Sequence, residues 1–254
     1  MGEESLEQLV VVLTMGRVGS TSIHASIPQR PGRVKYHVHS VNGRTLAKQV
    51  LRKGTLEKSA RSVRHGVEAK AAIEAFSGRV KIVSLVRDVV SRETSSAFAS
   101  LRATNDPETV GAILSDPVRT REFYWSTFSR GRPHVWFDNE IRDVFGIDVY
   151  DTPFPDEGWG RYSNGRFDLL VLRSESSRAL QASVVGEFIG DGEIPLITKN
   201  SQTSNDTVAR MYQQFKENLA FTESELHEYA QCRYQRHFYG AKVSPALAEA
   251  GTRR

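Results

Sequence analysis

The chain has 254 residues, of which 39% are hydrophobic and 25% are charged, a composition that suits a globular protein with a core. Lysine and arginine number 34 against 30 aspartates and glutamates, an excess too small to predict nucleic-acid binding by itself. The single cysteine, Cys232, excludes an intramolecular disulfide and a thiolate metal cluster.

The first residues are acidic, and the apolar run after them covers only positions 9–13. A secretory signal needs a basic start and a longer apolar stretch. No window approaches the roughly 20 apolar residues that cross a bilayer. We therefore expect a cytoplasmic protein without a transmembrane segment, in a reducing compartment.

Apolar runs and helical patterns alternate along the chain, which is typical of βαβ units. The patterns predict strands at 9–13, 34–38, 80–86 and 168–172. They predict helices from Ser22 onward, over 46–76 with breaks near Gly54 and Gly66, and over 89–101, 107–145, 176–188, 206–219 and 222–238. Residues 151–166, rich in Gly, Pro and Asp, read as an exposed hairpin or loop.

These elements predict a three-layer α/β fold with a mainly parallel central sheet, a strand-loop-helix like a P-loop, and a helical cap. We expect a single domain over residues 1–254. Within it, residues 106–166 form a helical and loop insertion on the acceptor side.

The segment Thr14–Ser22 comes directly after the first strand and reads TMGRVGSTS. Its glycines allow a tight turn, its hydroxyls stand where a helix begins, and Arg17 adds a permanent positive charge. A helix N-terminus attracts anions, so the segment is a candidate phosphate loop. A Walker loop would have lysine after its second glycine, where this chain has Ser20. A simple Gly/Ser turn is the structural alternative.

A second strand-to-helix junction has Arg87 at the end of the third strand, followed by Asp88 as a candidate helix cap. Ser91 and Ser95 are one helical turn apart. An arginine at a strand end together with a serine on the next helix can bind a second phosphate. An ordinary Arg–Asp surface pair is the alternative.

Together the two junctions resemble the sulfotransferases that use 3′-phosphoadenosine-5′-phosphosulfate (PAPS). Their first motif is a strand and a K/R-x-G-S/T-T loop, and their second is a strand-end arginine with a serine eight positions later. The resemblance implies that Arg17, Gly19, Ser20, Thr21 and Ser22 hold the 5′-phosphosulfate. It likewise assigns the 3′-phosphate to Arg87 and Ser95. Where the family usually has proline, this chain has Val89.

Other segments extend the resemblance towards carbohydrate enzymes. The segment Tyr36–Ser40, YHVHS, is similar to the Y-H-x-H segment of uronyl 2-O-sulfotransferases, in which a histidine is the catalytic base. The segments WFDNE at 136–140, FGIDVY at 145–150 and RHFY at 236–239 resemble bacterial proteins described as capsular-polysaccharide sulfotransferases. The implied acceptor is a hydroxyl of a carbohydrate or glycoconjugate.

Sulfuryl transfer needs a cation near the leaving oxygen and a base near the attacking hydroxyl. We assign the cation to Arg17 and the base to His39, with His37 as the second choice. Lys199 is assigned to a late loop near the nucleotide, as in similar enzymes. PAPS is the expected co-substrate and no metal is expected. The alternatives are a noncatalytic glycan- or partner-binding protein on this scaffold, and an NTP-dependent phosphotransferase.

Overall fold

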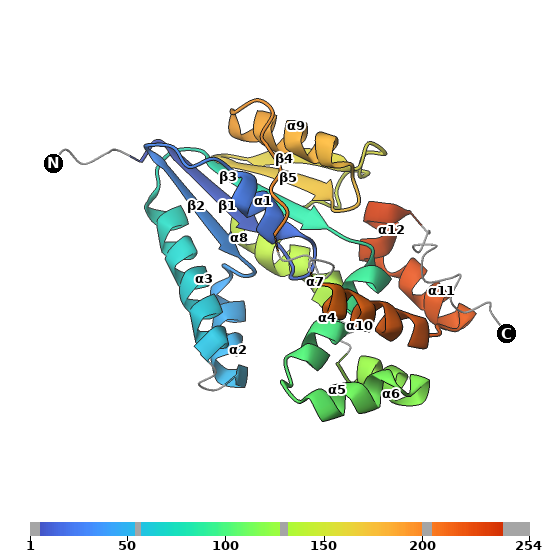
Figure 1. Cartoon of the computed structure of the whole chain (residues 1–254). Coiled ribbons are helices and arrows are strands. Elements are labelled where there is room, and N and C mark those ends of the chain that lie inside the picture. Colours follow the sequence, from blue (N-terminus) through green and yellow to red (C-terminus); the bar gives the residue numbers. More distant parts are fainter. Residues whose placement is uncertain (1–5, 54–56, 128–131, 200–204, 241–254) are drawn as a thin grey trace. The chain divides into compact units, whose positions relative to one another are not determined.

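The computed structural model describes residues 6–53, 57–127, 132–199 and 205–240. The chain divides into two compact units (Figure 1). Unit 1 takes residues 1–86 and 135–199, and unit 2 takes residues 87–134 and 200–254. Each unit is therefore assembled from two separate stretches of chain. The expected insertion, 106–166, is divided between them, and the single domain over 1–254 stays a prediction.

Unit 1 is built on a mostly parallel sheet of five strands in the described part of the chain, in the order β2-β1-β3-β5-β4. Only β4 runs antiparallel, against β5. Because the order reverses around β1, the carboxyl ends of β1 and β3 flank the point where α/β sheets bind ligands. The strands are β1 (Gln8–Leu13), β2 (Arg33–Val38), β3 (Val80–Val86), β4 (Trp159–Asn164) and β5 (Phe167–Arg173).

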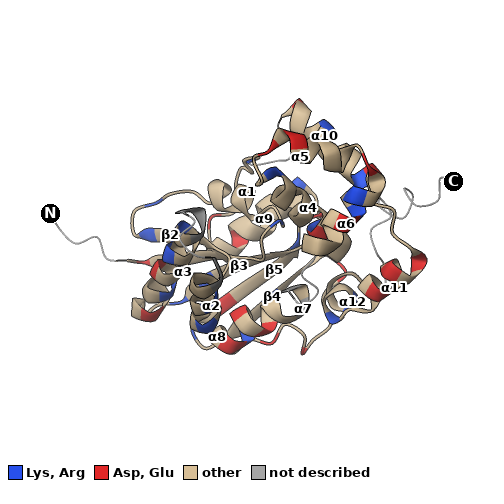
Figure 2. Ribbon diagram, turned by 90° about the horizontal axis from the view of Figure 1, so that it is seen from below, with Lys and Arg blue, Asp and Glu red and all other residues tan. Residues whose placement is uncertain are grey.

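Helices cover both faces of this sheet, which gives unit 1 three layers (Figure 2). On one face, Val10 and Val12 of β1 share a buried cluster with Ile23 of α1 and with Val185 and Phe188 of α9. On the other face lie α2, α3 and α8. The helices of unit 1 are α1 (Ser20–Ser26), α2 (Gly43–Lys53), α3 (Glu57–Ala75), a π-helix η1 (Asp138–Arg142), α8 (Asp143–Phe145) and α9 (Arg178–Ile189); α7 (Arg132–Phe137) begins in unit 2 and ends in unit 1.

The four predicted strands are confirmed, and the glycine-rich stretch supplies a fifth. Residues 159–164, inside the predicted hairpin or loop, form β4 and pair with β5. Gly165, with φ 55°, makes the tight turn between them. The mixed α/β class with a mainly parallel sheet is thus confirmed, while the P-loop-like and cap designations stay predictions.

The predicted helix break at Gly66 is wrong, because α3 runs through it from residue 57 to 75. A Cβ at Gly66 would stand 2.6 Å from the backbone oxygen of Ser40 and 2.7 Å from Cδ2 of Leu46. The glycine therefore permits a close approach between α3 and its neighbours rather than ending the helix.

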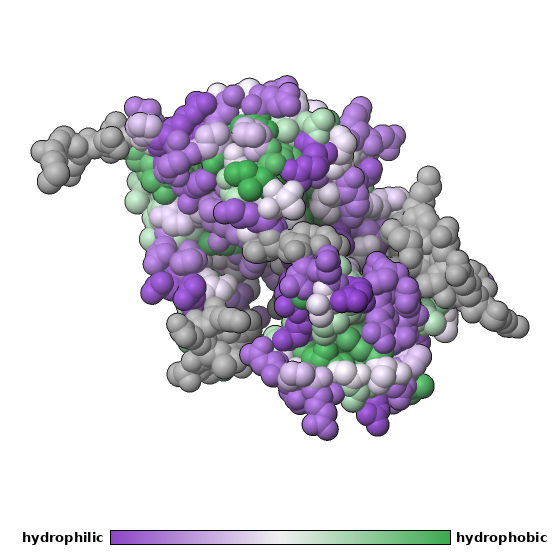
Figure 3. Space-filling view, viewed as in Figure 1, coloured by the Kyte–Doolittle hydropathy of each residue, from purple (hydrophilic) through white to green (hydrophobic). Residues whose placement is uncertain are grey.

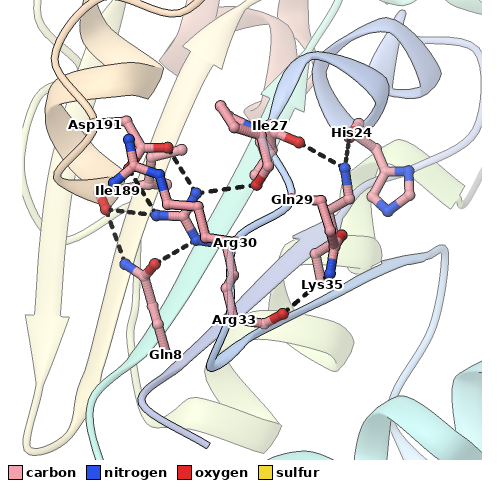
Figure 4. Close-up of polar contacts among 10 residues, drawn as sticks. Gln8, His24, Ile27, Gln29, Arg30, Arg33, Lys35, Ile189 and Asp191 are labelled. Atoms are coloured by element: carbon pink, nitrogen blue, oxygen red, sulfur yellow. Dashed lines mark hydrogen bonds and ion pairs between the residues drawn. The ribbon is translucent and has the colours of Figure 1, made fainter.

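A buried ion pair ties the amino ends of β1 and β2 to the end of α9 (Figure 4). Arg33 donates to both carboxylate oxygens of Asp191, at 2.6 and 2.7 Å, and to the side chain of Gln8 at 2.5 Å. Gln8 in turn donates to the Ile189 carbonyl at 2.8 Å. Hydrogen bonding from Arg33 lowers the pKa of Asp191. This network lies at the edge of the sheet opposite the strand carboxyl ends.

Unit 2 contains helices joined by short connections, and no strand, in its described residues. Phe98 of α4 packs against Tyr212 and Phe215 of α10, with ring centroids 5.0 and 5.6 Å apart. Tyr124 of α6 shares a 2.6 Å hydroxyl hydrogen bond with Tyr229 of α11. The helices are α4 (Val89–Arg102), α5 (Pro107–Leu114), α6 (Pro117–Thr127), α10 (Asp206–Asn218), α11 (Glu223–Gln231) and α12 (Arg233–Tyr239).

The surface seen in Figure 3 is largely hydrophilic, with smaller hydrophobic areas between polar side chains. Large exposed hydrophobic residues include Leu51 on α2, Val67 on α3 and Val118 on α6. Scattered apolar side chains of this kind are normal on a folded protein.

Candidate active site

The loop between β1 and α1 keeps its apolar side chains inside and its arginine outside. Met15 and Val18 are buried, whereas Arg17 and Gly19 are exposed. Arg17 has φ 74° and Gly19 has φ 81°, so both adopt the left-handed backbone region. An arginine held there carries a steric cost of about 1–2 kcal/mol, which glycine avoids. Strain of this kind collects at functional sites, which makes the loop a candidate for one.

Helix α1 begins without a capping side chain. Gly19 occupies the N-cap position and forms no side-chain cap hydrogen bond, and the first turn holds no acidic residue. Ser20, Thr21 and Ser22 form this first turn. Backbone N–H groups at the start of a helix favour an anion. The arrangement suits the phosphate or sulfate group that the sequence predicts here.

The first residue of α1 contacts the predicted histidine strand. The Oγ atom of Ser20 lies 2.8 Å from Nε2 of His37, which belongs to β2. Burial, and then the neighbouring His39 and His24, lower the pKa of His37 to about 3. His37 is therefore neutral at pH 7. The hydrogen bond joins the candidate phosphate loop to β2, the strand that contains His37 and leads directly into His39.

His39 comes just after β2 and is fixed by a backbone group of the loop. Its Nδ1 atom lies 2.8 Å from the carbonyl oxygen of Thr14. A carbonyl oxygen can only accept, so Nδ1 of His39 carries the proton and donates it. The neutral ring then has its lone pair on Nε2, the nitrogen that can receive a proton. The His37 and His39 rings meet edge to face, with centroids 5.3 Å apart.

A third histidine, His24 on α1, stacks on His37 with ring centroids 5.5 Å apart. Burial, and then the charge of Lys35, lower the pKa of His24, and Lys199 acts in the same direction. The Lys35 ammonium donates to the carbonyl oxygens of His24 and Ile27, at 3.2 and 2.6 Å (Figure 4). This side of α1 is thus a region of positive charge.

Lys199 lies beside α1, at the end of an extended stretch. Its N–H donates to Oγ of Ser22 at 3.0 Å, and the Ser22 hydroxyl lies 3.2 Å from the Lys199 carbonyl. One turn further along α1, Oγ of Ser26 accepts from the N–H of Ile197 at 2.7 Å. The serines of one α1 face thus hold the segment that carries Lys199, as a role near the loop requires.

Arg87 and Asp88 begin unit 2 and are anchored by α12. The Tyr234 hydroxyl accepts from the Arg87 N–H and donates to the Arg87 carbonyl, both at 3.0 Å. The Asp88 carboxylate caps α4 by accepting from the Ser91 N–H at 2.9 Å, which confirms the predicted cap. It also accepts from Gln235 at 2.9 Å.

Ser95, the predicted partner of Arg87, is 3% exposed within α4. Its neighbours Arg92 and Glu93 form a buried ion pair. The structure thus brings Arg17, the serines of α1, His37, His39 and Lys199 together within unit 1. Arg87 and Ser95 lie in unit 2.

Sequence reasoning missed the residues that support residues 39–42, the connection between β2 and α2 that we call the histidine loop. Trp136, Asn139 and Glu140 all bond to residues 39–42, from positions about 100 residues away in sequence. The segment WFDNE, residues 136–140, was noted only for its resemblance to other proteins. No local pattern predicts its contact with residues 39–42. His24 was missed because a lone histidine on a short helix has no distinguishing signal.

Within the described ranges, no group of three or more His, Cys, Asp and Glu side chains is arranged to hold a metal ion. Among the same residues, no helix combines the length and apolar character that crossing a bilayer demands.

Residues 126–240 match a family model, NKWYS, described as "Putative capsular polysaccharide synthesis protein". That segment resembles a capsular-polysaccharide family. The NKWYS match covers less than half of the chain and includes Trp136, Glu140, Lys199 and Tyr234, whereas Arg17, His37, His39 and Arg87 lie outside it. Searches of curated proteins and of solved structures gave no match.

Proposed function

We propose that this chain transfers a sulfuryl group from PAPS to a carbohydrate hydroxyl. The observation that carries the proposal is the Ser20–His37 hydrogen bond. Two segments that separately resemble sulfotransferase motifs, the loop after β1 and the Y-H-x-H segment, meet at this contact. The NKWYS similarity supports a polysaccharide or glycoconjugate as the acceptor.

The reaction is an in-line displacement at sulfur. The acceptor hydroxyl attacks sulfur and forms the new S–O bond, while the bond to the bridging phosphate oxygen breaks. The electron pair leaves with that oxygen, giving 3′,5′-adenosine bisphosphate. The hydroxyl proton passes to His39 Nε2, and Arg17 stabilises the charge on the leaving oxygen. Because arginine stays protonated, Arg17 acts through charge alone.

The low pKa of His37 supports His39 as the base. A group with a pKa of about 3 is a weak proton acceptor near neutrality. Its hydrogen bond to Ser20 suits it instead to orient that hydroxyl at the start of α1. Within the proposal, Ser20, Thr21, Ser22 and Lys199 bind the anionic nucleotide. Arg87 and Ser95 keep their assignment to the 3′-phosphate on the ground of sequence resemblance.

The first test is a calorimetric titration with 3′,5′-adenosine bisphosphate and, separately, with magnesium-ATP. We expect metal-independent binding of the bisphosphate, lost in Arg87→Ala, whose backbone bonds to Tyr234 remain possible. Arg119→Ala, which alters an exposed arginine of α6, is the matched control and should bind as wild type. Tight magnesium-ATP binding without bisphosphate binding would support a phosphotransferase instead.

The second test measures sulfuryl transfer from labelled PAPS to capsular-type oligosaccharides. Removing a general base typically costs about 10²–10⁴-fold, which is the loss expected for His39→Ala. Arg17→Ala should lose activity, while Arg17→Lys keeps part of it. Bisphosphate binding without transfer to any acceptor would favour the noncatalytic alternative.

A further inference from the structure

Each of the four residues between β2 and α2 is bonded to one short segment, Trp136–Glu140. The indole N–H of Trp136 donates to the His39 carbonyl at 3.1 Å. Ser40 and Val41 donate to the Glu140 carboxylate at 2.7 and 2.8 Å. The segment is thus hydrogen-bonded along the whole histidine loop, rather than at one residue.

Asn42 completes the set and links it to α2. Its N–H donates to Glu140 at 2.9 Å, and its side-chain amide donates to the Asn139 carbonyl at 2.7 Å. Its side-chain oxygen accepts from the N–H groups of Arg44 and Thr45, at 2.9 and 3.3 Å, at the start of α2. The loop is therefore fixed at its far end as well.

Glu140 is the centre of this arrangement. It is 1% exposed, and its two oxygens accept three hydrogen bonds, two of them from backbone N–H groups. A carboxylate near the N-terminus of α2 is also favoured by the helix dipole. The residue belongs to η1, a π-helix, and π-helical turns occur frequently at functional sites.

Hydrogen bonds hold both the backbone and the imidazole ring of His39. The His39 carbonyl is held from the side of Trp136, and the His39 Nδ1 is held by Thr14 from the side of β1. With both ends fixed, the ring has one orientation, and its Nδ1–H tautomer is the one that satisfies Thr14.

We propose that Glu140 and Trp136 are positioning residues for His39, which hold its ring in the Nδ1–H tautomer and direct Nε2 to the acceptor hydroxyl. This inference rests on the proposed function for its catalytic consequence. The structural part, the tautomer and orientation of His39, stands independently of any reaction.

The experiment compares the full-length protein with Glu140→Gln and Trp136→Phe. Glutamine keeps the size of the side chain but replaces one accepting oxygen by a donor, and phenylalanine keeps an aromatic ring but removes the indole N–H and part of the buried ring volume. Asp143→Asn, an exposed carboxylate-to-amide change in the adjoining α8, is the matched control. If Glu140→Gln does not fold, Trp136→Phe still tests the inference.

The primary measurement is ¹⁵N NMR of the His39 ring nitrogens across pH. We expect the Nδ1–H tautomer in wild type and in Asp143→Asn, and a mixture of tautomers with a shifted titration in the two test variants. For transfer, we expect kcat to fall about tenfold or more, with a shifted acidic limb of the pH profile and bisphosphate affinity within about twofold of wild type.

An unchanged His39 tautomer and titration in both folded variants would overturn the inference, whatever their activity. An altered tautomer in a protein that transfers no sulfuryl group would support the positioning role and refute the proposed reaction. The two claims therefore fail separately.

Discussion

His37 is held beside Ser20 in a form that resists protonation. Its imidazole lies between His24 and His39 and close to Ser20, and its pKa falls from 6.5 to about 3. Burial, the largest cause, penalises the charged ring. A histidine of this kind makes the folded state sensitive to acid.

Whether His37 lowers or raises stability in acid depends on which state, folded or unfolded, binds its proton more readily. Below pH 6.5 the unfolded chain protonates His37, while the folded chain does not do so until about pH 3. With respect to His37, the free energy of unfolding is therefore highest above pH 6.5. It falls as the pH drops towards 3, by up to about 1.4 kcal/mol per pH unit. We expect His37→Asn to reduce the loss of stability between pH 7 and pH 4.5 by about 2 kcal/mol.

Urea denaturation at the two pH values measures this difference. His227→Asn, at an exposed position of α11, is the control and should reproduce the wild-type curve. An identical acid dependence in His37→Asn and wild type would show that His37 is not held neutral in the folded state.

The sequence singled out the residues of the loop after β1 and the two histidines, His37 and His39, but not how they contact one another. The sequence predicted that His37 and His39 alternate on one strand; β2 ends at Val38, one residue before His39, and the two rings are nevertheless neighbours. The Ser20–His37 and His39–Thr14 hydrogen bonds depend instead on how α1 and β2 pack beside β1. Periodicity within one segment carries no information about such contacts.

At the scale of elements, two glycines in helices have opposite surroundings. A Cβ at Gly66 of α3 would press on Ser40 and Leu46, whereas a Cβ at Gly111 of α5 would meet nothing within 4 Å. Replacing glycine by alanine raises the intrinsic helix propensity by the same amount at both positions. Packing therefore decides the sign of each substitution.

We expect Gly66→Ala to destabilise the protein by about 1–3 kcal/mol, because α3 must move away from its neighbours. Gly111→Ala should stabilise it by up to about 1 kcal/mol, because only the backbone entropy changes. Thermal denaturation of the two variants measures the contrast. Equal stabilisation by both would show that α3 is not closely packed at Gly66.

The same packing explains why the predicted break at Gly66 fails. In a sequence, a glycine within a helical pattern can mark an end or a close approach, and only the neighbour reveals which. Strand β4 lies in the stretch predicted as a hairpin or loop, and the sequence did not choose between the two, since the pairing with β5 depends on the turn at Gly165. The strands predicted at 9–13, 80–86 and 168–172 were easier, because each is mostly apolar and buried.

At the scale of the whole molecule, each unit is assembled from distant stretches of chain. In unit 2, Phe98 lies before the return to unit 1, and its partners Tyr212 and Phe215 lie after it. The sequence predicted both helices but not their association, because aromatic residues pack with many partners. The stability of residues 87–134 must then depend on residues 205–240.

We expect Phe215→Ala, at a fully buried position, to cost about 3–5 kcal/mol and to act on a distant stretch of sequence. Amide hydrogen exchange of the full chain should show lost protection in α4 and α10, with β1, β3 and β5 less affected. Phe123→Ala, at a half-buried position of α6, is the control for aromatic truncation in the same unit. Uniform loss of protection along the whole chain would contradict independent local stability.

The π-helix η1 has a consequence for how this protein can change by insertion and deletion. A π-helical turn holds one residue more than an α-helical turn, so it is readily converted by a one-residue deletion. Deleting one residue between Phe137 and Asp143 would convert the wide turn into an ordinary α-helical turn, and the helical segments on either side would keep nearly the same orientation. A one-residue difference in length at this point is therefore a change that the helix carrying Trp136 can accommodate without turning its indole away from the His39 carbonyl.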